Sequence, residues 1–287
     1  MITRGLRPVS KRSRSDALLI SVVTVVLNGR DKIEKTIAGV SGQGFKNVQH
    51  IVIDGGSTDG TIEKLKKLRK HIDYCVSEPD RGISDAFNKG IAQAKGNLIG
   101  ILNAGDWYEP NALQMVAEAH RAHPEAEVLC GGLRFWERGE PTIVAYSNPS
   151  LLEKQTSVYH PAVFITRSTY EKHGLYDEGF HLAMDYELLF RFKRRGAHFL
   201  PVPAVLANMS LDGVSYRHWY VGLREVRAAR SRYFSAANVA TYHSVAVLKN
   251  LLAFALKKSG LGILYRAHWR FRNKRMAQRI SGAGRAS

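Results

Sequence analysis

Residues 51–61 read IVIDGGSTDGT, an apolar run that ends at Asp54 and is followed by a turn rich in glycine, serine and aspartate. Such a run is typical of a buried strand, and Ser57, Thr58 or Asp59 is suited to cap a helix that follows. A strand, a turn and a helix in this order form the repeating unit of α/β proteins. The stretch lacks GxGxxG and GxxxxGK[ST], which disfavours a dinucleotide-binding fold and a P-loop.

The same alternation extends along the first 110 residues. Periodicity predicts strands at residues 18–27, 48–54, 73–77 and 97–102, and helices at 31–42, 60–70 and 84–95. Strands that alternate with helices predict a parallel sheet with helices on both faces, whose ligands collect at the carboxyl ends of the strands. Asp54 and Asp106 both fall at such ends.

Two further clusters allow a structural and a functional interpretation. Residues 97–106, NLIGILNAGD, end in Asp106, and a turn alone accounts for Asn, Gly and Asp there. In residues 77–91, SEPDRGISDAFNKGI, Ser84 is a candidate helix cap and Asp85 suits the helix dipole. That interpretation leaves the preceding Asp-Arg-Gly unexplained.

Composition indicates a globular protein. The chain has 287 residues, of which 45% are hydrophobic, enough for one large core or two smaller ones. Its two cysteines, Cys75 and Cys130, form no CxxC pair, so neither a disulfide framework nor a structural zinc site is supported. This cysteine usage fits a reducing compartment.

The net charge of +17 is concentrated at the two ends of the chain. Residues 1–16 carry +4, residues 217–287 carry fifteen Lys and Arg against the single acid Glu225, and residues 17–216 carry −1. The apolar run after the basic N-terminus ends in Asn-Gly-Arg-Asp, which favours a strand over a secretory signal. No run reaches the about 18 apolar residues expected of a membrane-spanning helix.

Several motifs together carry a resemblance to a known family. TVVLN at 24–28, DGGSTDGT at 54–61, SEPDRGISDAFNKG at 77–90 and LNAGDWYEP at 102–110 resemble, in order and spacing, the nucleotide-binding half of family 2 glycosyltransferases. The resemblance spans roughly residues 20–215. It implies a GT-A fold, a nucleotide-sugar donor and a divalent metal ion, Mg²⁺ or Mn²⁺.

The resemblance also implies which residues bind the donor. These are Thr24, Asn28, Asp54, Gly56, Ser57, Gly82, Asp85, Asn103 and Asp106. The family's metal-binding Asp-x-Asp element is reduced here to Asp106, and Gly55 stands where many relatives carry a second acid. Mg²⁺ commonly uses one or two carboxylates together with waters and substrate phosphates, so Asp106 is the expected metal ligand.

The acceptor side is expected in residues 111–216. Residues 181–196, HLAMDYELLFRFKRRG, predict a helix, and Asp185 in its first turn matches the family's catalytic base, although Met184 replaces the preceding Glu. A first-turn acid favoured by the helix dipole is the alternative. His160 resembles part of the family's His-Gln segment and is expected to line the active site, or else to form structural hydrogen bonds. Residues 213–215, Gly-Val-Ser, resemble a loop near the donor phosphates.

The basic C-terminal segment is open to three interpretations. Val245, Leu248, Leu252 and Ala255 share one face of a predicted helix at 244–256, and aromatic residues alternate with Arg and Lys around it. Packing helices, an interfacial helix on anionic lipid and a single-strand nucleic-acid site all suit this pattern. The nucleic-acid interpretation has no recognisable binding motif, so the segment favours a peripheral position at the inner face of the cell membrane.

The sequence therefore predicts four parts and one leading function. The parts are a basic tail at 1–16, a donor-binding half at 17–110, an acceptor-binding half at 111–216 and a basic helical extension at 217–287. The leading function is an inverting, metal-dependent transfer of sugar to a saccharide or lipid-linked acceptor in cell-surface polysaccharide synthesis. The alternatives are a nucleotidyltransferase and a non-catalytic basic protein that binds membrane or nucleic acid.

Overall fold

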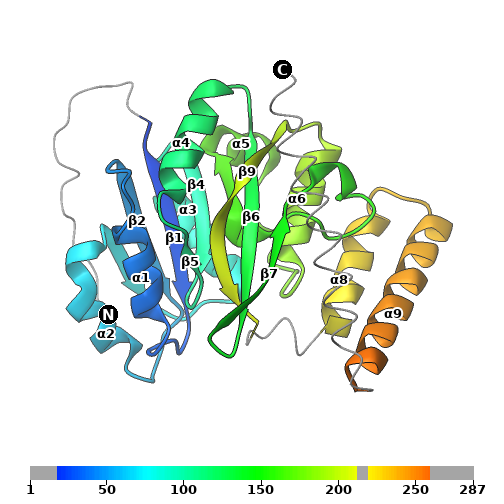
Figure 1. Cartoon of the computed structure of the whole chain (residues 1–287), viewed down its shortest axis with the longest axis horizontal. Coiled ribbons are helices and arrows are strands. Elements are labelled where there is room, and N and C mark those ends of the chain that lie inside the picture. Colours follow the sequence, from blue (N-terminus) through cyan, green and yellow to red (C-terminus); the bar gives the residue numbers. More distant parts are fainter. Residues whose placement is uncertain (1–17, 212–218, 259–287) are drawn as a thin grey trace.

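The computed structural model describes residues 18–211 and 219–258. Its first half alternates strands and helices, which confirms the predicted order (Figure 1). The elements are β1 (Ile20–Val26), α1 (Ile33–Ser41), β2 (Val48–Asp54), α2 (Thr61–Leu68), β3 (Tyr74–Ser77), α3 (Ile83–Gln93) and β4 (Leu98–Asn103).

The second half adds strands that the sequence pattern did not predict in detail. They are β5 (Trp107–Tyr108), β6 (Val128–Glu137), β7 (Glu140–Tyr146), β8 (Val163–Thr166) and β9 (Phe199–Ser210). The helices are α4 (Ala112–Ala122), α5 (Arg167–His173), α6 (Met184–Arg194), α8 (Trp219–Ser231) and α9 (Ala236–Lys258). Helix α6 lies inside the predicted range 181–196 and stops before Gly196, whose φ of +82° suits only a glycine well.

In the described part of the chain, nine strands form one sheet. Its order is β3-β2-β1-β4-β8-β6-β9-β5, with β7 paired to β6. The strands β3, β2, β1 and β4 are parallel to one another, whereas β8 runs antiparallel to both β4 and β6. The parallel half brings the carboxyl ends of β1, β2 and β4 to one edge.

Both faces of the central strands are buried, which explains their continuous apolar sequence. In β1, Val23 and Val25 pack on the face covered by α3 and α6, while Ile20 and Val22 pack on the face covered by α4. A third cluster joins Val26 to α1 and α2. The position of each strand, and therefore of its carboxyl end, is fixed by packing on two sides.

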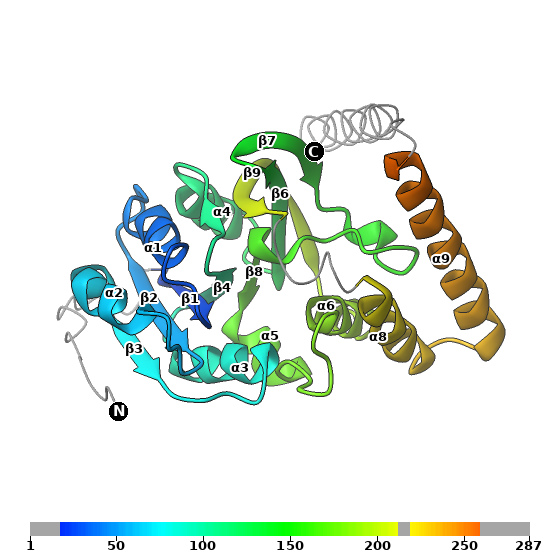
Figure 2. The same ribbon diagram turned by 90° about the horizontal axis from the view of Figure 1, so that it is seen from below.

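The C-terminal helices continue the helical layer on the α6 side. Helix α8 lies beside α6, and α9 lies on the outer side of α8 (Figures 1 and 2). Leu223, Val226 and Ala229 of α8 are buried, so the packing interpretation holds for this helix. Among the helices of residues 18–211 and 219–258, none is both long and apolar enough to cross a membrane.

Candidate active site

Predicted donor-side residues meet at the carboxyl edge of the parallel strands. Val26 of β1 pairs with Asp54 of β2, and Val25 of β1 pairs with Asn103 of β4. Adjacent parallel strands end side by side, so polar residues that follow them come together. The residues gathered at this edge are Asn28, Asp54, Asn103 and Asp106.

The carboxylate of Asp54 is fully buried and holds the turn after β2. Its Oδ2 accepts hydrogen bonds from the N–H groups of Gly56 at 3.2 Å and Ser57 at 3.0 Å and from the hydroxyl of Ser77 at 2.6 Å. Its Oδ1 accepts the hydroxyl of Ser57 at 2.5 Å. Gly56 has a φ of +87°, which glycine adopts without strain. Asp54 therefore shapes this turn. The base of a bound nucleotide would have to share these carboxylate oxygens with the groups of the turn.

Asn28 connects the end of β1 to the same turn. Its N–H donates to the hydroxyl of Ser57 at 2.7 Å, and its Oδ1 accepts the N–H of Thr58 at 2.9 Å. A Cβ on Gly55 would lie 2.4 Å from a carboxylate oxygen of Asp80. This contact explains why the turn carries glycine where the resemblance leads one to expect a second acid.

Asp106 lies in a tight turn after β4, with its side chain buried. The hydroxyl of Thr36 donates to the Asp106 carbonyl at 2.8 Å and accepts the N–H of Gly105 at 2.9 Å, which fixes the turn. Burial raises the pKa of Asp106 well above its ordinary range, although the charge of Lys32 and the N–H of Ser210 lower it. The effect of burial on Asp106 therefore outweighs the effect of the nearby Lys32.

Asn103 offers a second oxygen beside Asp106. Its Oδ1 is buried and has no hydrogen-bond partner among the described residues. Carboxylate and amide oxygens are the ligands that Mg²⁺ and Mn²⁺ prefer. No group of three or more His, Cys, Asp or Glu able to hold a metal occurs in residues 18–211 and 219–258. The residues present fit a divalent ion that also uses substrate phosphates and water.

Asp85 lies in the first turn of α3 and is held as an anion. It accepts the backbone N–H of Arg81 at 2.9 Å and forms ion pairs with the side chains of Arg81 at 3.1 Å and Lys89 at 3.3 Å. The N–H of Arg81 is the main reason that the pKa of Asp85 lies below its ordinary value. Asp85 therefore anchors the turn before α3.

The segment before α6 packs against this end of α3. The predicted cap by Ser84 is wrong, because its hydroxyl donates to the carbonyl of Phe180 at 2.8 Å while Gly82 occupies the N-cap position. Gly82 has a φ of +126°, and a Cβ there would lie 3.4 Å from the ring of His181. The segment predicted to bind the donor, at the start of α3, therefore meets the segment before α6, which belongs to the predicted acceptor side.

Asp185 lies in the first turn of α6, close to this meeting point. It is partly buried, and its Oδ1 accepts the N–H of Tyr186 at 2.7 Å. Burial raises the pKa of Asp185 to about 6, the charge of Glu225 adds to this rise, and hydrogen bonds from nearby N–H groups oppose it. A carboxylate with this pKa is mostly ionised at neutral pH and still basic enough to take up a proton.

Two predicted site residues lie inside the protein instead of at the strand ends. Thr24 is fully buried in β1, and its hydroxyl shares a hydrogen bond with Nε2 of His50 at 3.0 Å. His160 is buried and stacks on Phe87 at a centroid distance of 5.2 Å. Burial lowers the pKa of His160 to about 4, so its ring is neutral. The structure does not bring these two side chains together with the strand-end residues.

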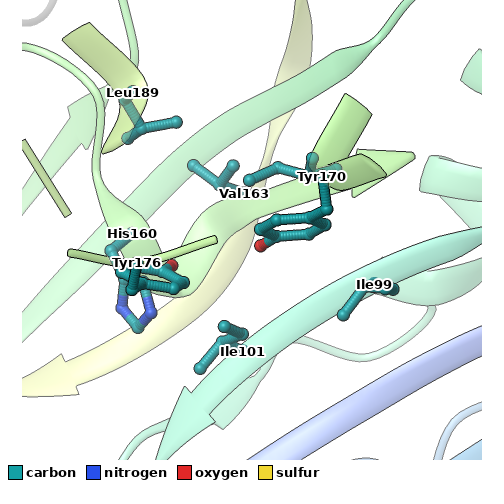
Figure 3. A pocket seen from close by; sticks show the side chains of 8 residues that line it. Ile99, Ile101, His160, Val163, Tyr170, Tyr176 and Leu189 are labelled. Carbon is teal, nitrogen blue, oxygen red and sulfur yellow. The ribbon is translucent and has the colours of Figure 1, made fainter. Parts of the chain in front are cut away.

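His160 instead lines a small cavity together with residues of β4, β8 and α6 (Figure 3). The cavity holds about 10 Å³, which is close to the space that one water molecule needs and too small for a sugar. The charge of Asp185 contributes to the raised pKa of Tyr176, so Asp185 lies close to one of the lining residues. The other lining residues are Ile99, Ile101, Val163, Ile165, Tyr170, Tyr176 and Leu189.

Two charged residues at this site were missed by the sequence analysis. Lys32 acts on Asp106, and Glu225 acts on Asp185. Lys32 had no distinguishing signal, whereas Glu225 is the only acidic residue in 217–287. The Gly-Val-Ser segment at 213–215, expected near the donor phosphates, lies outside the described residues.

Comparison with known proteins finds glycosyltransferases among the relatives of this chain. The chain is 31% identical over 188 residues to an uncharacterized glycosyltransferase of Mycobacterium tuberculosis, covering 62% of this chain and 70% of that relative. It is also 31% identical over 103 residues to the putative teichuronic acid biosynthesis glycosyltransferase TuaG of Bacillus subtilis, covering 35% of this chain and 41% of TuaG.

A solved structure has the same fold. A mannosyltransferase from Pyrobaculum calidifontis, in complex with GDP-Man and Mn²⁺, superposes with a TM-score of 0.60 at 16% sequence identity, covering 96% of this chain and 90% of that one. The sheet and its helical layers are therefore a GT-A fold. Residues 21–189, more than half of the chain, match the family model described as glycosyl transferase family 2. The chain belongs to glycosyl transferase family 2.

Proposed function

We propose that this protein transfers a sugar from a nucleotide-sugar donor to a saccharide or lipid-linked acceptor, with inversion at the anomeric carbon. One observation carries the proposal: the helix that bears Asp185 begins beside the N-terminus of α3. The segment just before α3 in turn contacts the turn held by Asp54, because Asp80 lies against Gly55. The name of TuaG supports a role in cell-surface polysaccharide synthesis.

The donor nucleotide binds along the carboxyl edge of β1 and β2. The turn held by Asp54 presents the backbone of Gly56 and Ser57, and Asn28 closes it from β1. On the other side, Gly82 allows the chain to approach closely at the start of α3, while the ion-paired Asp85 keeps that start in place. We assign base and ribose recognition to these groups.

Asp106, with Asn103, holds a divalent ion, Mg²⁺ or Mn²⁺, at the end of β4. When bound, this ion would offset the negative charge of the donor diphosphate. The burial of the Asp106 carboxylate and the unpaired Oδ1 of Asn103 among the described residues support this role, and so does the Mn²⁺ in the mannosyltransferase complex. Lys32 adds a further positive charge on this side.

Asp185 acts as the general base. It takes the proton of an acceptor hydroxyl while the hydroxyl oxygen bonds to the anomeric carbon, and the bond from that carbon to the donor phosphate breaks to release the nucleoside diphosphate. Its pKa of about 6 makes transfer rise as the pH increases through that value. Thr24 and His160 support the donor-side strands and the base from within the core.

The two alternatives are less well supported. A nucleotidyltransferase would need a basic, glycine-rich phosphate loop after the first strand, and the segment after β1 reads Leu-Asn-Gly-Arg-Asp. A non-catalytic protein would not need a buried carboxylate with a raised pKa at the meeting point of the two halves.

The proposal places the protein at the cytoplasmic face of the cell membrane. Val245, Leu248, Leu251 and Leu252 of α9 are all exposed, and the segment that contains them is strongly basic. An exposed apolar row beside basic residues suits the surface of anionic lipids. A lipid-linked acceptor would be reached from this position.

Donor binding tests the metal role. Calorimetry with a panel of UDP- and GDP-sugars should show binding to one donor that requires Mg²⁺ or Mn²⁺ and is largely lost in Asp106→Asn, because the variant lacks the carboxylate ligand. Asp31→Asn, which changes an exposed carboxylate in the same region, should bind like the wild type. Full donor affinity in EDTA would contradict the proposed metal site.

A further inference from the structure

Helix α6, which carries Asp185, begins without a cap from its own sequence. Its N-cap residue is Ala183, whose side chain has no hydrogen-bond acceptor. The N–H groups of His181, Leu182 and Ala183 come just before the first turn, and donors at the start of a helix need acceptors from outside the helix. For these three groups the acceptors come from another part of the chain.

Glu225 of α8 supplies the acceptors. Its Oε2 accepts the N–H groups of Leu182 and Ala183, each at 2.8 Å. Both of its carboxylate oxygens lie 3.1 Å from the N–H of His181. One carboxylate, more than forty residues away in sequence, therefore satisfies three consecutive donors. Hydrogen bonds to an ionised acceptor are roughly twice as strong as neutral ones.

Packing holds Glu225 in place. Leu223 and Val226, on either side of it in sequence, are buried. Further along α8, Arg230 is also buried, and its guanidinium donates to the hydroxyl of Tyr186 in α6 at 3.3 Å. The two helices lie side by side in both views (Figures 1 and 2). The carboxylate therefore approaches the start of α6 from a packed helix.

We propose that Glu225 is a positioning residue for the catalytic base: by binding the three N–H groups before α6, it fixes the start of that helix and the place of Asp185 beside α3. The proposal rests on the role given to Asp185 above. It makes α8 part of the active site, whereas the charge pattern predicted a separate extension beyond residue 216.

Glu225 also brings negative charge close to Asp185. Burial contributes most to the raised pKa of Asp185, and this charge adds to it. Tyr176, from the loop before α6, also interacts with Asp185, and burial keeps it uncharged. Removing the charge of Glu225 should therefore move the acidic limb of the activity profile to lower pH.

Three variants of the full chain separate positioning from a merely structural role. Glu225→Gln keeps an acceptor and loses the charge, and Glu225→Ala loses both. Glu153→Gln is the matched control, because Glu153 pairs with Arg194 at the far end of α6, 3.0 Å away. The measurements are kcat and donor KM from pH 5 to 9, and hydrogen exchange at the amides of residues 181–183.

We expect Glu225→Ala to lower kcat by about 10- to 100-fold with little change in donor KM, because small misplacements of a catalytic group cost rate more than binding. Its amides at 181–183 should exchange faster. Glu225→Gln should keep more activity and shift the acidic limb to lower pH, and Glu153→Gln should match the wild type. If Glu225→Ala does not fold, Glu225→Gln still decides, through its pH profile and exchange rates.

Other results would overturn the proposal. Unchanged exchange at residues 181–183 in Glu225→Ala would exclude the cap. A pH profile of Glu225→Gln identical to that of Glu153→Gln would exclude an effect on the base. Faster exchange together with full transfer by Asp185→Asn would show that the cap exists but that Asp185 is not the base, which separates failure of this inference from failure of the proposed function.

Discussion

Three carboxylates near the proposed site have pKa values that their surroundings shift in different directions. Hydrogen bonds and ion pairs lower the pKa of Asp85, burial raises the pKa of Asp185 to about 6, and burial raises that of Asp106 well above its ordinary range. When the environments of neighbouring acids give them different pKa values, each acid is suited to a different task. This division fits the roles proposed above, with Asp85 as an anchor, Asp185 as the proton acceptor and Asp106 as the cation ligand.

The ionised carboxylate of Asp185 in its desolvated position should lower the free energy of unfolding. The folded-state pKa of Asp185 lies above the value of an unfolded chain, so its ionisation destabilises the fold, fully above pH 6 and not at all below about pH 4. Asp185→Asn should therefore raise the free energy of unfolding by about 1 to 3 kcal/mol at pH 8 and leave it nearly unchanged at pH 4. Denaturant titrations at the two pH values measure the difference. Equal stabilities of both proteins at pH 8 would show that the carboxylate is not desolvated.

The local sequence pattern was enough to predict which residues lie at strand ends. It could not predict contacts between segments that are distant in the sequence. Asp54 and Asp106 stand out because each ends an apolar run. Whether Thr24 points toward the edge or into the sheet depends on its hydrogen bond to His50, which no local pattern encodes. Glu225 reaches its partners only because α8 packs on α6.

At the scale of elements, β1, β2 and β4 were predicted closely because both of their faces are buried. Such strands are continuously apolar and end at glycine-rich turns, so their bounds in the structure differ from the predicted ones by no more than two residues. The strands β6 to β9 were harder to predict from the sequence. β6 pairs with both antiparallel and parallel neighbours, and its register shifts twice against β9.

Two glycines test how closely the helices pack. A Cβ on Gly90 of α3 would lie 2.1 Å from a methyl carbon of Val23, so Gly90→Ala should lower the free energy of unfolding by about 1 to 3 kcal/mol. A Cβ on Gly222 of α8 would lie 3.7 Å from Leu182, an ordinary contact, so Gly222→Ala should raise it by about 0.5 to 1 kcal/mol. Chemical denaturation distinguishes the two signs. A Gly90→Ala protein as stable as the wild type would mean that α3 lies farther from β1.

At the scale of the whole molecule, the basic C-terminal segment has one purpose that its contacts show, which is packing, and a second that we propose, which is membrane binding. Arg230 stacks on Tyr242, 3.9 Å from its ring, and Arg232 forms ion pairs with Glu187 at 3.1 Å and Asp177 at 2.8 Å. Arg230 therefore joins α8 to α9, and Arg232, directly after α8, joins this region to α6 and to the segment before it. The exposed row on α9 is the surface that we propose for membrane binding.

Liposome sedimentation tests this second purpose. The full-length protein should sediment with anionic vesicles at low salt and be released at high salt, because charge attraction is screened over about 10 Å at 0.1 M ionic strength. Replacing the exposed Leu248, Leu251 and Leu252 by Gln should weaken binding, whereas Leu175→Gln, an exposed leucine near α5, should not. Equal binding to neutral and anionic vesicles, with tight binding to single-stranded RNA, would favour a nucleic-acid site.

The central claim is that donor-side residues at the strand ends deliver a nucleotide-sugar to the base Asp185. The most direct measurement is the release of nucleoside diphosphate by the purified protein from a panel of UDP- and GDP-sugars in Mn²⁺, compared with Asp185→Asn. The wild type should release product from one donor, and the variant should bind that donor equally well by calorimetry while turning it over about 10²- to 10⁴-fold more slowly. Equal turnover by the two proteins, or loss of donor binding in Asp185→Asn, would contradict the account.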